Sequence, residues 1–218
     1  METARLQTPD LPLAMLVDDD IAVREALGEL LDSVGVDSIT FSSGREFLEA
    51  ELPDRPACLV LDIRMPGLSG LELQHHLATK GIEIPIIFLT GHGDIPMSVQ
   101  AMKAGAVEFL TKPVRDQTFL DAVSGAISTD IVQRRSANRS RESETLYTTL
   151  TVRERQVIKG VVNGLLNKQI AFDLGISEVT VKLHRSNMMK KMQCGSVSQL
   201  CQVWQALPSK AREEHSVA

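Results

Sequence analysis

Carboxylates gather directly after two short apolar segments of this 218-residue chain. Asp18, Asp19 and Asp20 follow the first segment as an uninterrupted run, and Asp62 ends the later segment in LVLDIRMPG. If the two segments are neighbouring strands, the carboxylates converge, and like charges so close repel unless protons or a cation lie between them. Mg²⁺, a hard ion that prefers oxygen ligands and keeps several waters, is the cofactor we expect for such a cluster.

Two further polar side chains end apolar segments in the same way. Thr90 closes PIIFLT, and Lys112 follows VEFLT and precedes Pro113. Carboxylates, a hydroxyl and an ammonium group around a divalent cation suit phosphoryl transfer, because that chemistry is catalysed mainly by positioning and charge neutralisation. Each feature alone also has an ordinary explanation. An Asp run often caps a helix, as we expect for Asp20, and a single lysine is commonly a solvated surface group.

The segments that would position these groups alternate in character along the first half of the chain. Short apolar runs are separated by longer amphipathic stretches, which is the order of repeated strand and helix units. The runs are 13–17, 36–41, 58–61, 85–90 and 107–111, and the stretches are 20–34, 43–51, 69–80, 96–105 and a last one from about Asp116. This order predicts an α/β fold with a doubly wound, five-stranded parallel sheet, whose site lies beyond the carboxyl ends of the strands.

The two halves of the chain differ in the sign of their charge. Residues 1–129 carry 9 Lys and Arg against 20 Asp and Glu, whereas residues 147–218 carry 10 against 5. An acidic part suits the handling of cations, and a basic part suits contact with a polyanion. Residues 129–146 lie between them and are rich in Ser, Arg, Thr and Glu, which predicts a linker that is helical at its start.

The basic part has a helical period and regular capping residues. Thr151 and Glu154 fit a capping box, Asn167 can cap a second helix that stops at Gly175, and Ser177 can cap a third. Two helices joined by a short turn that contains glycine form a helix-turn-helix, here within a small all-α domain. A fourth amphipathic helix is expected over residues 198–207.

The third of these helices has one polar face. Lys182, Arg185 and Ser186 share it at helical spacing, and Val181 and Met188 lie on another face that can pack on the domain. Such a helix fits the major groove of duplex DNA, with cations on phosphates and a few side chains at base edges. A surface helix with a solvated charged face is the alternative that this pattern alone leaves open.

The motifs VDDD, LDIRMPGLSG, LTGHGD and FLTKP, in this order and spacing, resemble the receiver domain of two-component response regulators, specifically the FixJ type. The resemblance covers residues 12–128 and implies a flavodoxin-like sheet. It implies that Asp62 is the phosphoacceptor, attacking a phosphohistidine on a sensor histidine kinase. The implied Mg²⁺ ligands are Asp18 (partly through water), Asp19, Asp62 and the backbone carbonyl of Arg64. Lys112 would pair with a phosphoryl oxygen, Thr90 would move to the phosphoryl group, and Phe109 would turn inward behind it.

The segment LTVRERQVIKGVVNGLLNKQIAFDLGISEVTVKLHRSNMMKKM resembles the LuxR/NarL/FixJ-type output domain, here assigned to residues 147–210. This resemblance implies that Lys182, Leu183 and Ser186 face base edges, and that Lys168 and Arg185 meet the DNA backbone. His184 either joins them or packs half-buried in the domain. The helix over residues 198–207 would serve in dimerisation, or its apolar stripe would simply complete the core.

Together the two resemblances imply a transcription regulator. Phosphorylation would change the face formed by the fourth helix, fifth strand and fifth helix, and the chain would then form a homodimer or release its output domain. A dimer presents two recognition helices to neighbouring half-sites. The implied partners are a sensor kinase, an operator in duplex DNA and RNA polymerase, with activation of transcription as the expected outcome and at most slow self-dephosphorylation as enzymatic activity. Arg64 and His92 are the positions where we expect the phosphoryl lifetime to be tuned.

The sequence also bears on the compartment. Cys58, Cys194 and Cys201 form neither a C-x-x-C pair nor an even disulfide framework, which indicates reducing conditions. The first ten residues lack the pattern of a signal peptide, and no apolar run approaches the roughly 20 residues of a bilayer span. We therefore expect a soluble, cytoplasmic protein with no membrane partner.

Three other functions fit parts of the sequence. A phosphatase of the haloacid dehalogenase type also uses Asp, Mg²⁺, Thr and Lys, but it requires D-x-D-x-T, and here Ala22 stands in place of the Thr. A small-ligand sensor in front of the same output domain would have no use for Lys112 and three carboxylates at strand ends. A regulator that acts on RNA differs from the predicted one in its preference for RNA over duplex DNA.

Overall fold

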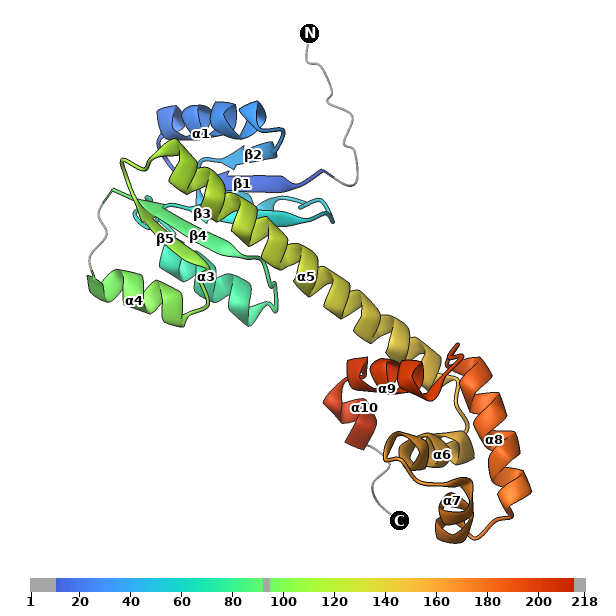
Figure 1. Cartoon of the computed structure of the whole chain (residues 1–218). Helices are drawn as coiled ribbons and strands as arrows, with labels where there is room; N and C mark the ends of the chain where they lie inside the picture. The colour runs from blue at the N-terminus through green and yellow to red at the C-terminus, as the bar shows by residue number, and fades with distance from the viewer. Residues whose placement is uncertain (1–10, 92–94, 214–218) are drawn as a thin grey trace. The chain divides into compact units, whose positions relative to one another are not determined.

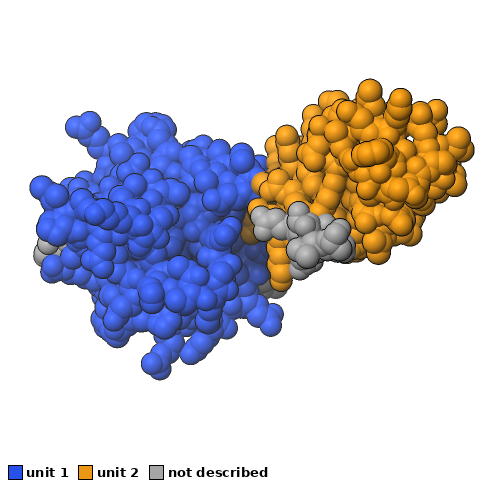
Figure 2. Space-filling view, turned by 90° about the horizontal axis from the view of Figure 1, so that it is seen from below, with its two compact units in different colours: residues 1–133 blue, residues 134–218 orange. Residues whose placement is uncertain are grey.

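A computed structural model describes residues 11–91 and 95–213 of the chain. The chain divides into two compact units, residues 1–133 and residues 134–218, which Figure 2 colours separately. The division falls between Gln133 and Arg134, inside the segment predicted as a linker. Each unit has apolar core residues of its own.

Unit 1 is a parallel sheet with helices on both faces (Figure 1). Its elements are β1 (Leu13–Val17), α1 (Ile21–Ser33), β2 (Asp37–Phe41), α2 (Gly44–Glu49), β3 (Ala57–Leu61), α3 (Gly70–Thr79), β4 (Ile86–Thr90), α4 (Ile95–Lys103), β5 (Glu108–Thr111) and the first part of α5 (Asp116–Thr148). The strand order is β2-β1-β3-β4-β5, and every neighbouring pair is parallel. The predicted doubly wound sheet is confirmed.

The strands feed two separate cores because successive side chains point to opposite faces of a sheet. In β1, Leu13, Met15 and Val17 pack with α2 and α3, whereas Ala14 and Leu16 pack with α1 and α5. The central strands β1, β3 and β4 are buried throughout, and the edge strands β2 and β5 are partly exposed. Burial on both faces explains why the central strands read as continuous apolar runs in the sequence.

The polar segment 129–146 is helical along its whole length, although its composition favoured a helix only at its start. It belongs to α5, which runs for 33 residues. Residues 126–147 contain neither glycine nor proline, so nothing in the backbone interrupts the helix that begins in unit 1. The Asp130 carboxylate, which is 2% exposed, accepts a hydrogen bond from the backbone N–H of Ala57 at 2.8 Å and fixes α5 to the start of β3.

Up to residue 213, where the described part of the chain ends, unit 2 consists of the end of α5 and five further helices. These are α6 (Val152–Val162), α7 (Asn167–Leu174), α8 (Glu178–Lys191), α9 (Val197–Ala206) and α10 (Ser209–Glu213). The predicted capping box of Thr151 and Glu154 is confirmed, as is the Ser177 cap of α8. Gly175 ends α7 in the left-handed conformation, with φ +63°. A turn of three residues therefore joins α7 to α8, and the predicted helix-turn-helix is confirmed.

The predicted cap of α7 is wrong by one residue. Leu166 holds the N-cap position and Asn167 is the first helical residue. The Gln169 side chain accepts a hydrogen bond from the Leu166 backbone N–H at 2.8 Å, so the helix start is secured without an Asn, Ser or Asp cap. A leucine at the cap could not be anticipated, because polar residues dominate that position.

An apolar core joins the end of α5 to α6, α7, α8 and α9. Val181 and Met188 of α8 pack with residues of α6, α7 and α9, including Val157 and Leu200, as the predicted inner face of α8 requires. Gly160 allows α6 and α7 to approach closely, because a Cβ at this position would lie 2.7 Å from Cγ1 of Ile170. None of the helices in the described part of the chain combines the length and apolar character of a membrane span.

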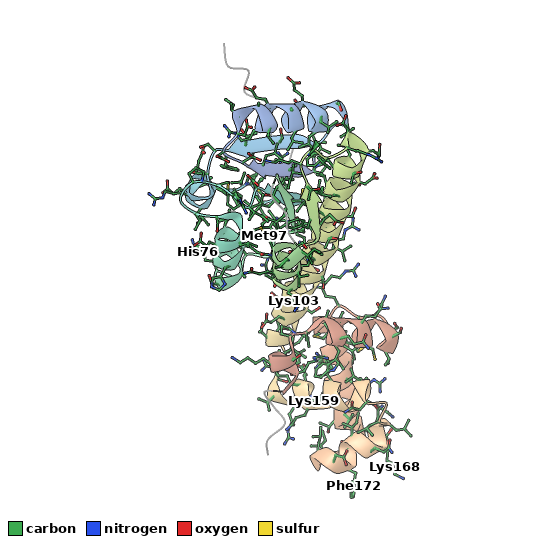
Figure 3. All side chains as sticks on the ribbon, turned by 90° about the vertical axis from the view of Figure 1, so that its left-hand side faces the viewer. His76, Met97, Lys103, Lys159, Lys168 and Phe172 are labelled. Atoms are coloured by element: carbon green, nitrogen blue, oxygen red, sulfur yellow. The ribbon has the colours of Figure 1, made fainter. Side chains whose placement is uncertain are left out.

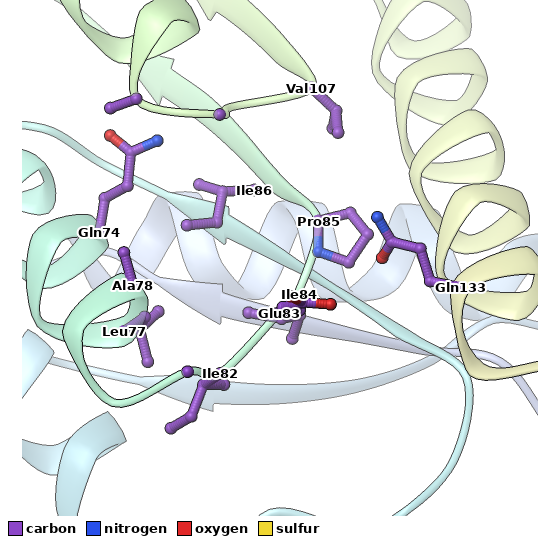
Figure 4. A pocket seen from close by; sticks show the side chains of 13 residues that line it. Gln74, Leu77, Ala78, Ile82, Glu83, Ile84, Pro85, Ile86, Val107 and Gln133 are labelled. Atoms are coloured by element: carbon purple, nitrogen blue, oxygen red, sulfur yellow. The ribbon is translucent and has the colours of Figure 1, made fainter. Parts of the chain in front are cut away.

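A hollow of about 420 Å³ lies at the amino end of β4 (Figure 4). Gln74 and Leu77 of α3, Pro85 and Ile86 at the start of β4, and Val107 line part of it. Because Thr90 ends the same strand, the hollow lies at the opposite edge of the sheet from the predicted site.

Candidate functional site

The carboxylates predicted from the strand ends do converge at the carboxyl edge of the sheet. Val17 of β1 pairs with Leu61 of β3, so Asp18 and Asp62 leave the sheet side by side. Carboxylate oxygens of Asp18, Asp19 and Asp62 all lie within 4.8 Å of one another. Asp18 and Asp62 are buried and Asp19 is exposed, which leaves one side of the cluster open to solvent.

Lys112 reaches the same cluster from β5. Its Nζ donates a short hydrogen bond to Oδ2 of Asp18 and lies 3.8 Å from Oδ2 of Asp62. Its backbone N–H donates to the carbonyl oxygen of Thr90 at 2.9 Å, which holds the ends of β4 and β5 together. A cation between two carboxylates offsets part of their repulsion.

Asp62 sits in an environment that disfavours its charge. Burial raises the pKa of this carboxyl above 3.8, Lys112 opposes the rise, and the nearby Asp18 carboxylate adds to it. Hydrogen bonds from the Thr90 hydroxyl and from the Ile63 backbone N–H, the latter at 2.8 Å, also lower the pKa, but the net shift is upward. An anion with a raised pKa and an adjacent ammonium group is a common feature of functional sites.

The loops around the cluster hold its backbone firmly. The carboxylate of Asp18 accepts from the Asp20 backbone N–H at 3.0 Å, and Arg24 donates to the Asp18 carbonyl oxygen at 2.5 Å. After β3 the chain turns back so closely that a Cβ on Gly70 would lie 2.3 Å from the carbonyl oxygen of Asp62. The Arg24 contact was not predicted, because one arginine among the many charges of an amphipathic helix carries no positional signal.

The remaining predicted residues lie around this cluster. Asp20 caps α1, as expected, by accepting from the Ala22 backbone N–H at 2.9 Å, and it is not part of the carboxylate cluster. Phe109 is half-buried, with its ring centroid 6.3 Å from that of Phe88. The Arg64 side chain is exposed, and His92 lies outside the described residues.

The carboxylate oxygens of the cluster are suitable ligands for a hard divalent cation. Three carboxylates offer oxygen ligands within a short span, and one of them is exposed to solvent, where retained waters could lie. The acidic pocket is typical of Mg²⁺ binding in receiver domains. Asp18, Asp19 and Asp62 are the residues that could hold the ion.

The predicted DNA contacts lie on two helices of unit 2. Lys182, Leu183 and Ser186 are exposed on α8, and Lys168 is exposed at the start of α7. Figure 3 shows Lys168 and Phe172 projecting from α7, and Phe172 is 88% exposed.

Two residues of this surface are only partly exposed. Arg185 and His184 are both half-buried. Cys58, Cys194 and Cys201 are all free, and the first two are buried, as expected of ordinary apolar residues.

A doubly wound sheet with this acidic cluster, followed by a helix-turn-helix unit, defines a receiver domain joined to a DNA-binding domain. Residues 14–124 match the response regulator receiver domain family, and residues 148–204 match the LuxR family of bacterial regulatory proteins. The first match lies within unit 1 and the second within unit 2.

Relatives share both domains with this chain. Nodulation protein W of Bradyrhizobium diazoefficiens is 49% identical over 89% of this chain and 86% of its own length. The transcriptional regulatory protein FixJ of Azorhizobium caulinodans is 44% identical over 85% of this chain and 88% of its own length. The solved structure of response regulator StyR is similar with a TM-score of 0.79 and 47% identity, covering 89% of this chain and 98% of StyR. The chain therefore belongs to the two-component response regulators with a LuxR-type DNA-binding domain, as its resemblance to the FixJ type predicted.

Proposed function

We propose that this response regulator accepts a phosphoryl group on Asp62 from a sensor histidine kinase and then binds duplex DNA as a dimer to activate transcription. The observation that carries the proposal is the convergence of Asp18, Asp19, Asp62 and Lys112 at the carboxyl edge of the sheet. These groups come from the ends of three different strands, so the cluster is a product of the fold rather than of local sequence.

The phosphoryl step is a displacement at phosphorus. An Asp62 carboxylate oxygen forms a bond to the phosphorus of a phosphohistidine, the P–N bond breaks, and its electron pair stays on the imidazole nitrogen of the kinase. Lys112, whose Nζ lies 3.8 Å from Oδ2 of Asp62, would move to pair with an oxygen of the transferred group. The Thr90 hydroxyl already donates a hydrogen bond to the Asp62 carboxylate. After the transfer it would donate to an oxygen of the phosphoryl group.

Mg²⁺ would be held by Asp18, Asp19, Asp62 and the backbone carbonyl of Arg64, with Asp18 acting partly through water. Its role when bound is to neutralise charge on the phosphoryl oxygens. The chain itself orients the carboxylates, through the Asp20 backbone N–H on Asp18 and the Ile63 backbone N–H on Asp62.

The switch that follows would act on α4, β5 and α5. Thr90 would move toward the phosphoryl group, and the half-buried Phe109 ring, whose centroid lies 6.3 Å from that of Phe88, would turn inward behind it. On α4 a stripe of Ile95, Val99 and Met102 is 79%, 45% and 44% exposed. An apolar stripe at helical spacing suits a second copy of the same face.

DNA recognition would fall to unit 2. Lys182, Leu183 and Ser186 would face base edges in the major groove, and Lys168 and Arg185 would meet phosphates. A dimer places two copies of α8 on neighbouring half-sites and gains effective concentration from their linkage. RNA polymerase would be the next partner at an activated promoter.

The proposal is tested by measuring duplex DNA binding with and without a small phosphodonor and Mg²⁺. The wild-type protein should bind a duplex selected from a randomised pool at least about tenfold more tightly once it is phosphorylated. Asp62→Asn should bind the duplex with the affinity of unphosphorylated wild type, whether or not the phosphodonor is present. A single-stranded RNA of equal length should compete poorly for the protein at the same salt concentration. Equal affinity of wild type and Asp62→Asn under all conditions would contradict the proposal.

A further inference from the structure

Asn167 does not perform the capping role that its sequence position favours. Leu166 holds the N-cap of α7, and Gln169 satisfies the Leu166 backbone N–H. The Oδ1 atom of Asn167 instead accepts a hydrogen bond at 3.0 Å from a terminal nitrogen of Arg185, which lies 18 residues further along the chain on α8. The first residue of α7 is therefore joined to the predicted recognition helix by a side-chain contact.

The chemistry of this contact differs from that of two other cations on α8, which pair with carboxylates. Lys182 pairs with Glu178 at 3.2 Å, and Lys191 pairs with Glu154 at 2.7 Å. The partner of Arg185 is a neutral amide, and within residues 11–91 and 95–213 no carboxylate forms an ion pair with it. The contact orients the guanidinium group and leaves its full positive charge available.

The position of Arg185 fits an orienting contact. Arg185 and Asn167 are half-buried, whereas Lys182, Ser186 and Lys168 around them are exposed. The hydrogen bond to Asn167 holds the head group of Arg185 at the start of α7. A guanidinium group has five N–H donors in a rigid plane, so one bond to Asn167 leaves four for another acceptor.

From this geometry we infer that Asn167 is a positioning residue for DNA binding, which holds the Arg185 guanidinium ready for a phosphate of the duplex. The inference rests on the proposed function and deepens it. Arginine side chains lose much rotamer freedom when they are fixed, and a side chain ordered before binding loses less of it on binding. Planar guanidinium groups also match phosphate oxygens best when their orientation is defined.

The test is a double-mutant cycle in the full-length, phosphorylated protein. Wild type, Asn167→Ala, Arg185→Ala and the double variant would be titrated with the duplex that wild type selects from a randomised pool. Asn167→Ala should weaken binding about fivefold. Arg185→Ala should weaken it by about tenfold or more, because a charge-assisted hydrogen bond is lost. The double variant should bind no more weakly than Arg185→Ala alone, because Asn167 acts only through Arg185.

Salt dependence separates orientation from charge. Arg185→Ala should reduce the slope of log Kd against log salt by about one, because one phosphate contact is lost. Asn167→Ala should leave the slope unchanged, because it removes no charge. Asn167→Asp should bind more weakly than Asn167→Ala, since a carboxylate would hold Arg185 and neutralise it.

Matched variants guard against an effect on folding. Alanine is a strong helix former and Asn167 is not a cap, so α7 should persist in Asn167→Ala, with a thermal midpoint for unit 2 close to that of wild type. Asn163→Ala serves as the control, because Asn163 is an exposed asparagine at the end of α6 whose side chain forms no hydrogen bond with the described residues. It should bind the duplex like wild type.

Two results would overturn the inference and leave the proposed function standing. One is a wild-type affinity in Asn167→Ala. The other is an equal loss of duplex affinity when Asn167→Ala is introduced into wild type and into the Arg185→Ala variant. That result would mean that Asn167 acts independently of Arg185. Failure of the phosphorylated wild-type protein to bind any duplex would instead overturn the proposed function, and the inference with it.

Discussion

At the scale of single residues, the carboxylate run after β1 divides into three different roles. The Asp18 carboxylate pairs with Lys112, Asp20 caps α1, and Asp19 is exposed beside the two buried carboxylates. Neighbours in sequence thus differ in function because the chain turns from strand to helix between them. Substitution of one at a time separates metal binding from helix capping.

Asp19→Ala should leave the metal-free stability of unit 1 within about 0.5 kcal/mol of wild type and abolish most of its stabilisation by Mg²⁺. Asp20→Ala should lower the free energy of unfolding by about 1 kcal/mol, because the cap of α1 is missing. Its stabilisation by Mg²⁺ should equal that of wild type. Thermal unfolding over a range of Mg²⁺ concentrations measures both. Equal Mg²⁺ responses in Asp19→Ala and wild type would remove Asp19 from the metal site.

Asp62 gives a pH-dependent prediction. Because burial raises the pKa of Asp62 above 3.8, the folded state binds a proton more tightly than the unfolded state does. The contribution of Asp62 to the free energy of unfolding therefore falls as the pH rises above 3.8. At neutral pH the ionised Asp62 carboxylate destabilises the folded state. Asp62→Asn removes this charge and should raise the thermal midpoint of unit 1 by about 3 °C at pH 7 without metal.

The stabilisation by Asp62→Asn should shrink as pH falls toward 3.8, where the wild-type carboxyl itself becomes protonated. Calorimetry at several pH values measures the trend. An Asp62→Asn protein that is less stable than wild type at pH 7 would mean that the Lys112 contact outweighs burial.

At the scale of elements, an ion pair ties α6 to the end of α8. Glu154, which is 3% exposed, accepts from Lys191 at 2.7 Å and from the Thr151 backbone N–H at 2.8 Å. Burial alone would raise the pKa of Glu154, but these hydrogen bonds and the Lys191 charge lower it below 4.5 overall. The same carboxylate therefore caps one helix and fixes the recognition helix.

Glu154→Gln should destabilise unit 2 by about 2 kcal/mol, because Lys191 loses its ionic partner and the capping acceptor is weakened. A carboxyl with a lowered pKa stabilises the fold above its ordinary pKa, and this stabilisation is lost as pH falls below 4.5. Urea unfolding of unit 2 at several pH values measures both effects. Glu178→Gln, in an exposed pair with Lys182, is the control and should change the stability by less than about 0.5 kcal/mol.

The sequence predicted the elements whose pattern is local, together with the positions where strands end. The five strands, the Thr151 and Ser177 caps and the site residues Asp18, Asp62, Thr90 and Lys112 all follow from apolar runs that stop at polar residues. Contacts that depend on side-chain placement across elements were not predictable, as Arg24 on the Asp18 carbonyl and Arg185 on Asn167 illustrate. The full length of α5 was missed because polar composition indicates exposure and does not by itself exclude a helix.

At the scale of the whole molecule, the proposed function requires that chemistry at Asp62 change the association of chains. The exposed stripe of α4 is the surface on which this step would depend. Val99→Glu should weaken the phosphorylation-induced dimer by more than about tenfold, because a charge would be buried without a partner. Labelling of Asp62 should stay at the wild-type level.

Analytical ultracentrifugation of phosphorylated protein measures the dimer. Val152→Glu is the matched control, since Val152 is an exposed valine at the start of α6 in unit 2. It should dimerise like wild type. A Val99→Glu protein that dimerises normally would place the interface on another face.

The central claim is that the carboxylate cluster serves to place a phosphoryl group on Asp62. The most direct measurement is the stoichiometry of covalent labelling by a small phosphodonor, read by intact-protein mass spectrometry and mapped to a peptide. Wild type should take up close to one phosphoryl group per chain on Asp62, only in the presence of Mg²⁺, and Asp62→Asn should take up none. Full labelling of Asp62→Asn, or labelling of wild type that is independent of divalent metal, would contradict the account.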